Sequence, residues 1–225
     1  MGKNVLITRP KEQAVELAAF LREQGFLPFI EPIFAVEKMA IPKIERAFSS
    51  VIITSINACD ALENIGFDPH TKIFTIGKKT EKELRAFGFL NVITSPKNSA
   101  ESLEKMVAKE EGDILYLRGE KISFDFAARH PNVTEITAYK IQPAENFSPE
   151  LLNFAPKNIF DEVLLFSSNS AEIFFNLAIK HNLLEYFLAS QIFCLSEKIQ
   201  KRTKELGFEK VANFSEHKFL KKFYE

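Results

Sequence analysis

The sequence has no tryptophan, only two cysteines and eight glycines in 225 residues, and no long apolar run. A helix that spans a bilayer needs about 18 or more consecutive apolar residues, so we expect no membrane segment. The N-terminal MGKNVLITRP has no long apolar stretch of the kind that secretory signal peptides carry, and we expect no such peptide. Cys59 and Cys194 have no metal-ligand spacing, which favours reduced thiols in a cytoplasmic protein.

An excess of positive charge is also missing. The 29 Lys and Arg residues are balanced by 30 Asp and Glu residues, for a net charge of −1. Nucleic-acid-binding surfaces normally need a clear basic excess, so we expect no nucleic-acid partner. No Gly-x-Gly-x-x-Gly and no Gly-x4-Gly-Lys-Ser/Thr motif is present, which argues against a Rossmann dinucleotide site and a P-loop.

The usual side chains of acid–base and metal catalysis are scarce. All four histidines, His70, His130, His181 and His217, fall outside the loops that follow the expected strands, and we interpret each as a solvated surface residue. No Ser–His–acid set, zinc-ligand cluster or pair of carboxylates can be assembled in those loops. We therefore expect any chemistry to proceed without histidine and without a metal.

An internal duplication is the most informative feature that is present. VIITSINACDAL (51–62) and VLLFSSNSAEIF (163–174) each lead an apolar strand into a Ser-x-(Asn/Ser)-Ala turn that opens a helix. Each is followed by a second strand–helix unit, IFTIGKKTEKELRAFGF (73–89) and IFCLSEKIQKRTKELGF (192–208). Such a repeat predicts two similar α/β halves, with a ligand bound between them.

Apolar runs alternate with amphipathic stretches along the whole chain, which predicts parallel sheets covered by helices. We expect a discontinuous first domain, 1–34 plus 144–225, and an inserted second domain, 39–136, joined by a ribbon of 35–38 and 137–143. The N-terminal strand–helix unit favours this arrangement because its own neighbours end at Pro32. Two consecutive domains divided once near Pro143 is the alternative.

Ligands of open α/β sheets bind beyond the carboxyl ends of the strands, so the loops after the strands are the candidate site. Most of these loops carry hydroxyl, amide or lysine groups and open a helix, whose N-terminus attracts anions. Ser55 and Ser168 also fit simple N-caps, each worth about 1 kcal/mol of helix stability. The basic residues of the loops, such as Arg9, Lys78 and Arg118, are individually weak signals in a chain so rich in Lys and Arg.

The succession of motifs resembles the uroporphyrinogen-III synthase family over nearly the whole chain. The motifs are ITRP, TSINA, IGKKTEKEL, SAESL, ILYLRG, ITAYK and FSSNSAEIF. The resemblance implies two flavodoxin-like parallel-sheet domains joined by a two-stranded antiparallel ribbon. It also implies the cyclising dehydration of hydroxymethylbilane to uroporphyrinogen III, with ring D inverted and without a cofactor or metal.

The resemblance suggests Tyr139 as the catalytic residue, one that protonates or orients the departing hydroxyl. The alternative for Tyr139 is a ring packed in the ribbon with its hydroxyl in water. The substrate-binding candidates from the resemblance and the strand-end loops are Thr8, Arg9, Ser55, Ile56, Asn57, Gly77, Lys78, Thr80, Arg118, Gly119, Ser168, Asn169 and Ser196. One departure from the family pattern is Glu197 and Ile199 in the second copy, where Gly-x-x-Thr is usual. A hydroxyl donor is absent there, which puts contacts on that side in doubt.

Two other functions remain open at this point. A catalytically silent relative that binds a tetrapyrrole or another anion is compatible with the changes at Glu197 and Ile199. A two-domain nucleotide-sugar transferase is less favoured, because phosphate-binding glycines are absent. We expect a monomer with hydroxymethylbilane as its small-molecule partner, and a transient contact with the preceding enzyme of the pathway is left open.

Overall fold

A computed structural model describes residues 2–224, with every side chain among them except those of Glu63 and Asn64. The chain forms two compact units. Unit 1 consists of Met1–Ala35 and Gln142–Glu225, and unit 2 consists of Val36–Ile141. Among the described residues, no helix has the length and apolar character needed to cross a membrane.

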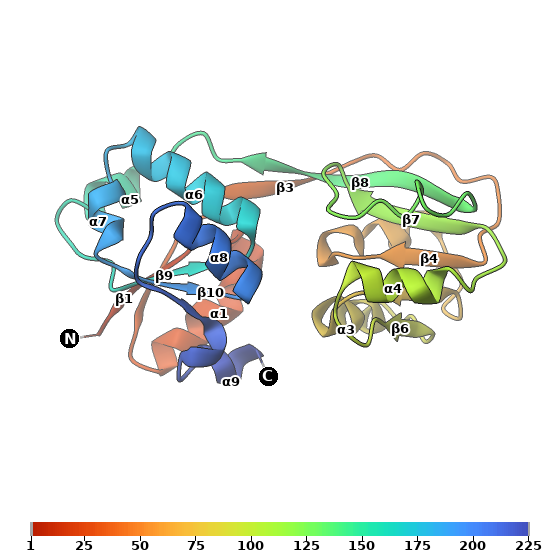
Figure 1. Cartoon of the computed structure of the whole chain (residues 1–225), viewed down its shortest axis with the longest axis horizontal. Coiled ribbons are helices and arrows are strands. Elements are labelled where there is room, and N and C mark those ends of the chain that lie inside the picture. Colours follow the sequence, from red (N-terminus) through yellow and green to blue (C-terminus); the bar gives the residue numbers. More distant parts are fainter. Residues whose placement is uncertain (1, 225) are drawn as a thin grey trace. The chain divides into compact units, whose positions relative to one another are not determined.

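Unit 1 contains a five-stranded parallel sheet with the order β2-β1-β9-β10-β11. Figure 1 labels β1, β9 and β10 of this sheet. Its strands are β1 (Asn4–Ile7), β2 (Leu27–Ile30), β9 (Glu162–Leu165), β10 (Gln191–Cys194) and β11 (Val211–Asn213). Numbered along the chain this is the order 2-1-3-4-5 of flavodoxin-like folds, as we predicted.

Helices cover both faces of this sheet. Its helices are α1 (Lys11–Glu23), α5 (Pro149–Phe154), α6 (Ser168–Lys180), α7 (Leu184–Leu188), α8 (Glu197–Glu205) and α9 (Leu220–Tyr224), with the short 3-10 helix η2 (Phe214–Glu216). Val5 and Ile7 of β1 pack with residues of α1 and α9, whereas Leu6 packs on the opposite face with residues of α5 to α8. This alternation along one strand divides the core into two layers.

Unit 2 contains a six-stranded sheet with the order β3-β8-β7-β4-β5-β6 (Figure 1). Its strands are β3 (Phe34–Lys38), β4 (Ser50–Ile53), β5 (Lys72–Thr75), β6 (Val92–Thr94), β7 (Ile114–Gly119) and β8 (Val133–Pro143). All neighbours from β8 to β6 are parallel. The 3-10 helix η1 (Ile56–Ala58), α2 (Ala61–Ile65) and α3 (Lys78–Ala86) cover one face, and α4 (Ala100–Val107) covers the other.

The edge strand β3 runs antiparallel to β8. The amide of Met39 donates to the Ala138 carbonyl at 2.9 Å, and the amide of Ala144 donates to the Ile33 carbonyl at 2.8 Å. Because the residue numbers rise on one strand and fall on the other, the directions are opposite. Both strands continue from one unit into the other along the chain.

The two sheets have the same spatial order of parallel strands, but the chain enters them at different points. The duplicated strands β4-β5-β6 and β9-β10-β11 occupy equivalent places, and the remaining pair is β7-β8 in unit 2 and β1-β2 in unit 1. When the parallel strands of unit 2 are numbered along the chain from β4 to β8, their spatial order from β6 to β8 is 3-2-1-4-5. In this respect unit 2 departs from the predicted flavodoxin-like order. The reason is that its extra pair follows the repeat in sequence instead of preceding it.

Two glycines end equivalent helices of the repeat. Gly88 follows α3 with φ 90°, and Gly207 follows α8 with φ 97°. A left-handed backbone at this position favours glycine, which has no Cβ to collide with the preceding turn. These glycines are the two on which the copies align, so the structure explains their place in the sequence.

The interpretation of the histidines as solvated was wrong for His217. Its side chain is buried, and its Nε2 lies 3.0 Å from Oε2 of the buried Glu162. The amides of Phe219 and Leu220 donate to its Nδ1, so the ring holds the chain where α9 begins. The spacing of a single histidine in sequence carries no signal for such a long-range partner. His130 and His181 are partly buried, and His70 is exposed.

Candidate functional site

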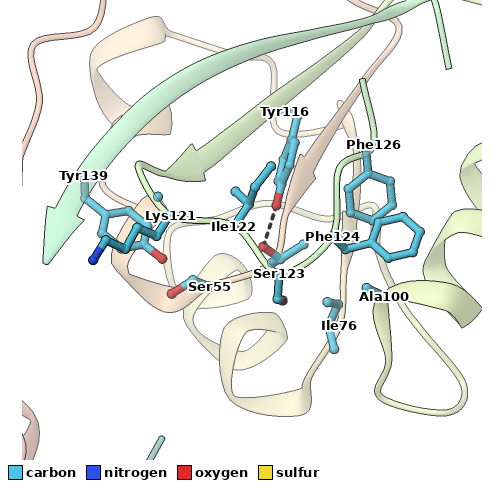
Figure 2. A pocket seen from close by; sticks show the side chains of 12 residues that line it. Ser55, Ile76, Ala100, Tyr116, Lys121, Ile122, Ser123, Phe124, Phe126 and Tyr139 are labelled. Carbon is cyan, nitrogen blue, oxygen red and sulfur yellow. Dashed lines mark hydrogen bonds between the residues drawn. The ribbon is translucent and has the colours of Figure 1, made fainter. Parts of the chain in front are cut away.

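A pocket of about 200 Å³ lies in unit 2, beyond the carboxyl ends of β4, β5 and β7 (Figure 2). Ligands of parallel α/β sheets bind at this edge of the sheet. The pocket is lined by Thr54, Ser55, Ile76, Ala100, Tyr116, Gly119, Lys121, Ile122, Ser123, Phe124, Phe126 and Tyr139. Three of the predicted site residues, Ser55, Gly119 and Tyr139, therefore share one pocket.

Two tyrosines line the pocket, and their environments differ. Tyr116 of β7 is 3% exposed, and its hydroxyl lies 3.2 Å from the Thr54 hydroxyl. Burial raises the pKa of Tyr116, so its phenol stays protonated at neutral pH. Tyr139 of β8 is half-buried, and no described residue hydrogen-bonds to its hydroxyl. Tyr139 is thus the phenol that is available to a ligand.

Ser55 has a structural role as well as a place in the pocket. It is the N-cap of η1, and its Oγ accepts a hydrogen bond from the Asn57 amide at 3.3 Å. Its backbone is extended, as an N-cap residue requires. Ile56 and Asn57 lie in η1, and Ile56 packs against the core of unit 2. Neither of these two lines the pocket.

The far end of the pocket is aromatic. Figure 2 shows Tyr139 and Ser55 at one end and Phe124 and Phe126 at the other. The rings of Phe124 and Phe126 are 4.7 Å apart, and Phe126 contacts Tyr116 edge-on at 5.2 Å. The ammonium-bearing Lys121 and the hydroxyl of Ser123 come from the same loop after β7. The pocket therefore combines hydroxyl groups and one cation with an aromatic end.

Arg118 does not line this pocket. Its Nε lies 3.0 Å from the Glu135 carboxylate, and its Nη1 donates to the carbonyls of Gly119 and Glu120 at 2.8 and 3.0 Å. The guanidinium thus holds the end of β7 and the turn that follows it. Its charge is partly neutralised by Glu135 on the neighbouring strand.

The three candidates at the start of α3 also lie outside the pocket lining. Gly77 is the N-cap residue of α3, Lys78 is exposed in its first turn, and Thr80 is buried. Ile76, the residue just before them, is the one that reaches the pocket.

In unit 1, Thr8 and Arg9 are interior residues at the end of β1. The Thr8 hydroxyl donates to the Leu164 carbonyl at 2.7 Å, which links β1 to β9. Arg9 is 8% exposed, lies over the Phe166 ring at 4.4 Å, and donates to the Tyr224 hydroxyl at 3.1 Å and to Gln13. Burial lowers the pKa of Arg9.

The remaining candidates lie at the starts of α6 and α8. The cap of α6 is Ser167 and not Ser168: the Ser167 Oγ accepts from the Ser170 amide, and the Ser170 Oγ accepts from the Ser167 amide, each at 2.9 Å. The capping interpretation of Ser168 was therefore wrong by one residue. Ser168 is partly exposed, and Asn169 and Ser196 are exposed.

Comparisons with known proteins agree with this architecture. The family described as "Uroporphyrinogen-III synthase HemD" matches residues 15–219. The chain belongs to the uroporphyrinogen-III synthase family.

A solved uroporphyrinogen-III synthetase from Helicobacter pylori is 14% identical with a TM-score of 0.61, over 94% of this chain and 92% of the other. A mutant uroporphyrinogen III synthase from the extremely thermophilic bacterium Thermus thermophilus is 16% identical with a TM-score of 0.59, over 95% and 91%. These likenesses confirm the α/β fold.

A curated relative, the porphyrin biosynthesis protein HemD of Ruminiclostridium josui, is 29% identical over 129 residues. The match covers 50% of this chain and 25% of the relative. The chain therefore spans about a quarter of the length of that relative.

The departure from the pattern of the synthase family at Ile199 has a structural explanation. Ile199 is 6% exposed and belongs to the core of unit 1, and Thr80 at the equivalent place in unit 2 is also 6% exposed. Both side chains face mainly the interior of their own unit. The isoleucine therefore replaces a core residue, whereas Glu197 is exposed in the first turn of α8.

Sequence reasoning missed Tyr116 and the loop residues Ser123, Phe124 and Phe126. Tyr116 lies inside an apolar strand, where alternation predicts burial and nothing distinguishes a pocket from a core. The apolar residues of the loop after β7 show no periodicity, so the sequence did not predict that this loop turns back toward the ends of the strands.

Proposed function

We propose that this protein catalyses the cyclising dehydration of hydroxymethylbilane to uroporphyrinogen III with inversion of ring D. Family membership over residues 15–219 supports the reaction class. The observation that carries the proposal to the site is the Tyr139 hydroxyl, which lies in a pocket at the strand ends without a partner among the described residues.

The proposed reaction breaks the C–O bond of the hydroxymethyl group and, because ring D inverts, it also breaks one C–C bond and forms two. The hydroxyl group of the bilane leaves with a proton as water, and a cationic azafulvene remains. The ring D carbon that bears the methylene bridge attacks this cation and forms a first C–C bond. The bond from that carbon to its own methylene bridge then breaks, which leaves a second azafulvene cation on ring C. The other α-carbon of the inverted ring D forms the second C–C bond with this cation and releases its proton. Tyr139 donates a hydrogen bond to the departing oxygen, because its phenol is the more accessible of the two in the pocket.

The pocket matches part of the substrate. Pockets for drug-sized ligands usually measure about 300–1,000 Å³. A volume of about 200 Å³ accommodates one pyrrole ring with its acidic arms rather than a whole tetrapyrrole. The Phe124 ring suits the flat pyrrole, and Lys121 with the hydroxyls of Ser55 and Ser123 suits carboxylates. Positioning the reactive end of a flexible chain is the main catalytic requirement.

A coupled assay tests the proposal. Hydroxymethylbilane is generated enzymatically, the protein is added, and the oxidised products are separated into porphyrin isomers I and III. We expect isomer III to predominate, because the unaided bilane closes without inversion to isomer I. Isomer I alone, from protein that is folded by circular dichroism, would contradict the proposal.

We further propose that the protein acts as a monomer in the cytoplasm. The two buried free cysteines suit a reducing compartment. Light scattering after size-exclusion chromatography checks the mass against 25.7 kDa. The same measurement in a mixture with the enzyme that makes hydroxymethylbilane checks for a transient complex.

A further inference from the structure

Tyr139 owes its place in the pocket to an irregularity of the sheet. Along β7 and β8, Leu117 pairs with Ile136 and Arg118 pairs with Thr137, but the next pair is Gly119 with Tyr139. Strand β7 advances by one residue where β8 advances by two, so Ala138 is the extra residue of a β-bulge. Bulges change the face to which the following side chain points.

The packing shows which face Tyr139 occupies. Ile136 and Ala138 pack with Leu117 in the core under η1, α2 and α3, whereas Tyr116 packs on the opposite face with α4. In a regular strand, successive side chains point to opposite faces, so Tyr139 would lie on the face opposite to that of Ala138. Tyr139 instead packs against the same core as Ala138. The bulge therefore turns this one ring toward the face of η1 and Ser55.

Gly119 supplies the space that the ring needs. A Cβ atom at residue 119 would lie 2.8 Å from Cζ of Tyr139 and 2.9 Å from its hydroxyl oxygen. No φ in the left-handed region is involved, so this glycine is required for room and not for its backbone conformation. The Tyr139 carbonyl accepts from the Glu120 amide at 2.9 Å, which holds the strand beside the glycine.

We propose that Gly119 and the bulge at Ala138 are a positioning device that sets the Tyr139 hydroxyl in the pocket for the reaction. This inference rests on the proposed function. Gly119 touches Tyr139 and acts through it, so it is a positioning residue. A methyl group at residue 119 moves the hydroxyl, even though it adds no charge and removes no hydrogen-bonding group.

The first test observes Tyr139 directly and needs no activity. The chain has four tyrosines, so a protein labelled with 13Cζ-tyrosine gives four signals, and Tyr139→Phe identifies one of them. We expect Gly119→Ala to shift the Tyr139 signal and to leave that of the exposed Tyr186 unchanged. An unchanged Tyr139 signal would overturn the positioning role.

The second test measures kcat in single and double variants. A hydroxyl that assists a readily departing group is expected to contribute about tenfold to kcat, below the usual range for a general acid. We expect Gly119→Ala and Tyr139→Phe each to lower kcat about tenfold with little change in KM, and the double variant to lose no more than either one. If the double variant lost kcat by the product of the two single losses, Gly119 would act independently of the hydroxyl.

Gly112→Ala is the matched control, because Gly112 precedes the other end of β7. A Cβ there would lie 2.6 Å from Cβ of Ser49, far along the strand from the pocket. We expect this variant to lower the melting temperature without changing kcat or the Tyr139 signal. A loss of kcat equal to that of Gly119→Ala would show a general effect of destabilising unit 2.

A stability cycle covers the case in which Gly119→Ala folds poorly. Tyr139→Ala removes the atoms that the new methyl group would meet, so Gly119→Ala should destabilise the parent but not the Tyr139→Ala protein. Equal destabilisation in both backgrounds would overturn the inference. If the parent forms no isomer III, the proposed function fails, whereas the NMR and stability tests still decide the positioning. A shifted signal with full kcat would overturn the link to the reaction.

Discussion

Glu162 and His217, 55 residues apart in sequence, share a buried 3.0 Å hydrogen bond in unit 1. Glu162 opens β9, and His217 precedes α9, so the bond ties the C-terminal segment to the middle of the sheet. Lys3 lies 3.0 Å from the other carboxylate oxygen. Burial raises the pKa of Glu162, but the hydrogen bonds from His217 and Lys3 outweigh this effect, so the net pKa is lowered.

Glu162→Gln should therefore lower stability in a pH-dependent way. Because the pKa of Glu162 is lowered by folding, its carboxylate stabilises the fold at pH values above 4.5, its ordinary pKa. This stabilisation is lost as pH falls through the pKa of the folded state. We expect a loss of roughly 2 kcal/mol at pH 7, since charged hydrogen bonds are replaced by neutral ones. Urea unfolding at pH 7 and at pH 3.5 measures the loss, which should shrink at the lower pH. Glu209→Gln, at an exposed position, is the control, and equal losses at both pH values would contradict the expectation.

Glu31 should show the opposite pH dependence. It is 2% exposed, and its carboxylate accepts from the Ser148 amide at 2.7 Å and from the Ser148 hydroxyl at 2.6 Å. Burial raises the pKa of Glu31 despite these bonds. Its contribution to the stability of the fold is therefore fully present below pH 4.5, the ordinary pKa of the carboxyl, and is lost as pH rises through the pKa of the folded state.

Glu31→Gln keeps the shape and can still accept from the amide of Ser148. Relative to this variant, the parent should lose unfolding free energy between pH 4.5 and neutral pH. Urea titrations across that range test this, with the exposed Glu23→Gln as control. Parallel pH curves for parent and Glu31→Gln would show that the burial of Glu31 has no such effect.

The cap of α6 gives a third prediction. Ser167→Ala removes both hydrogen bonds that its Oγ makes with Ser170, and we expect a loss of about 1 kcal/mol in unfolding free energy. Ser168→Ala, one residue further, should change stability by only a few tenths of that amount. If Ser168→Ala destabilised the protein as much as Ser167→Ala, the assignment of the cap would be wrong.

The two cysteines should be unreactive in the folded protein. Burial raises the pKa of Cys59 to about 12 and also raises that of Cys194. Since the thiolate is the reactive form, a disulfide reagent at pH 8 should label neither thiol quickly. In urea both should react. Rapid labelling of one thiol without denaturant would reveal local opening of the unit that contains it.

Much of this architecture was predictable from residue patterns. The apolar runs predicted nearly all the strands, and the repeat predicted that β4-β5 and β9-β10 open equivalent parts of two sheets. Ser55 and Gly119 were named as candidates because they follow or end strands, and both line the pocket. The resemblance suggested Tyr139.

The remainder depends on contacts between distant segments. His217 is buried where it can hydrogen-bond to Glu162, and the bulge at Ala138 arises where β8 pairs with β7. Neither feature produces a periodic pattern in the sequence. Thr8 and Arg9 follow a strand just as Ser55 does, yet their side chains are held inside unit 1. A strand end therefore predicts where a loop lies, but not whether its side chains face a ligand.

The different entry points of the chain into the two sheets have a consequence during synthesis. Unit 2 is one continuous stretch, Val36–Ile141, and all the strands of its sheet exist once β8 ends at Pro143. In unit 1, β1 lies inside the sheet and pairs with β9, which the ribosome makes about 155 residues later. Unit 2 can thus fold first, while the N-terminal β1 and β2 wait with an open strand edge. That edge is the part of the nascent chain that most needs protection from other chains.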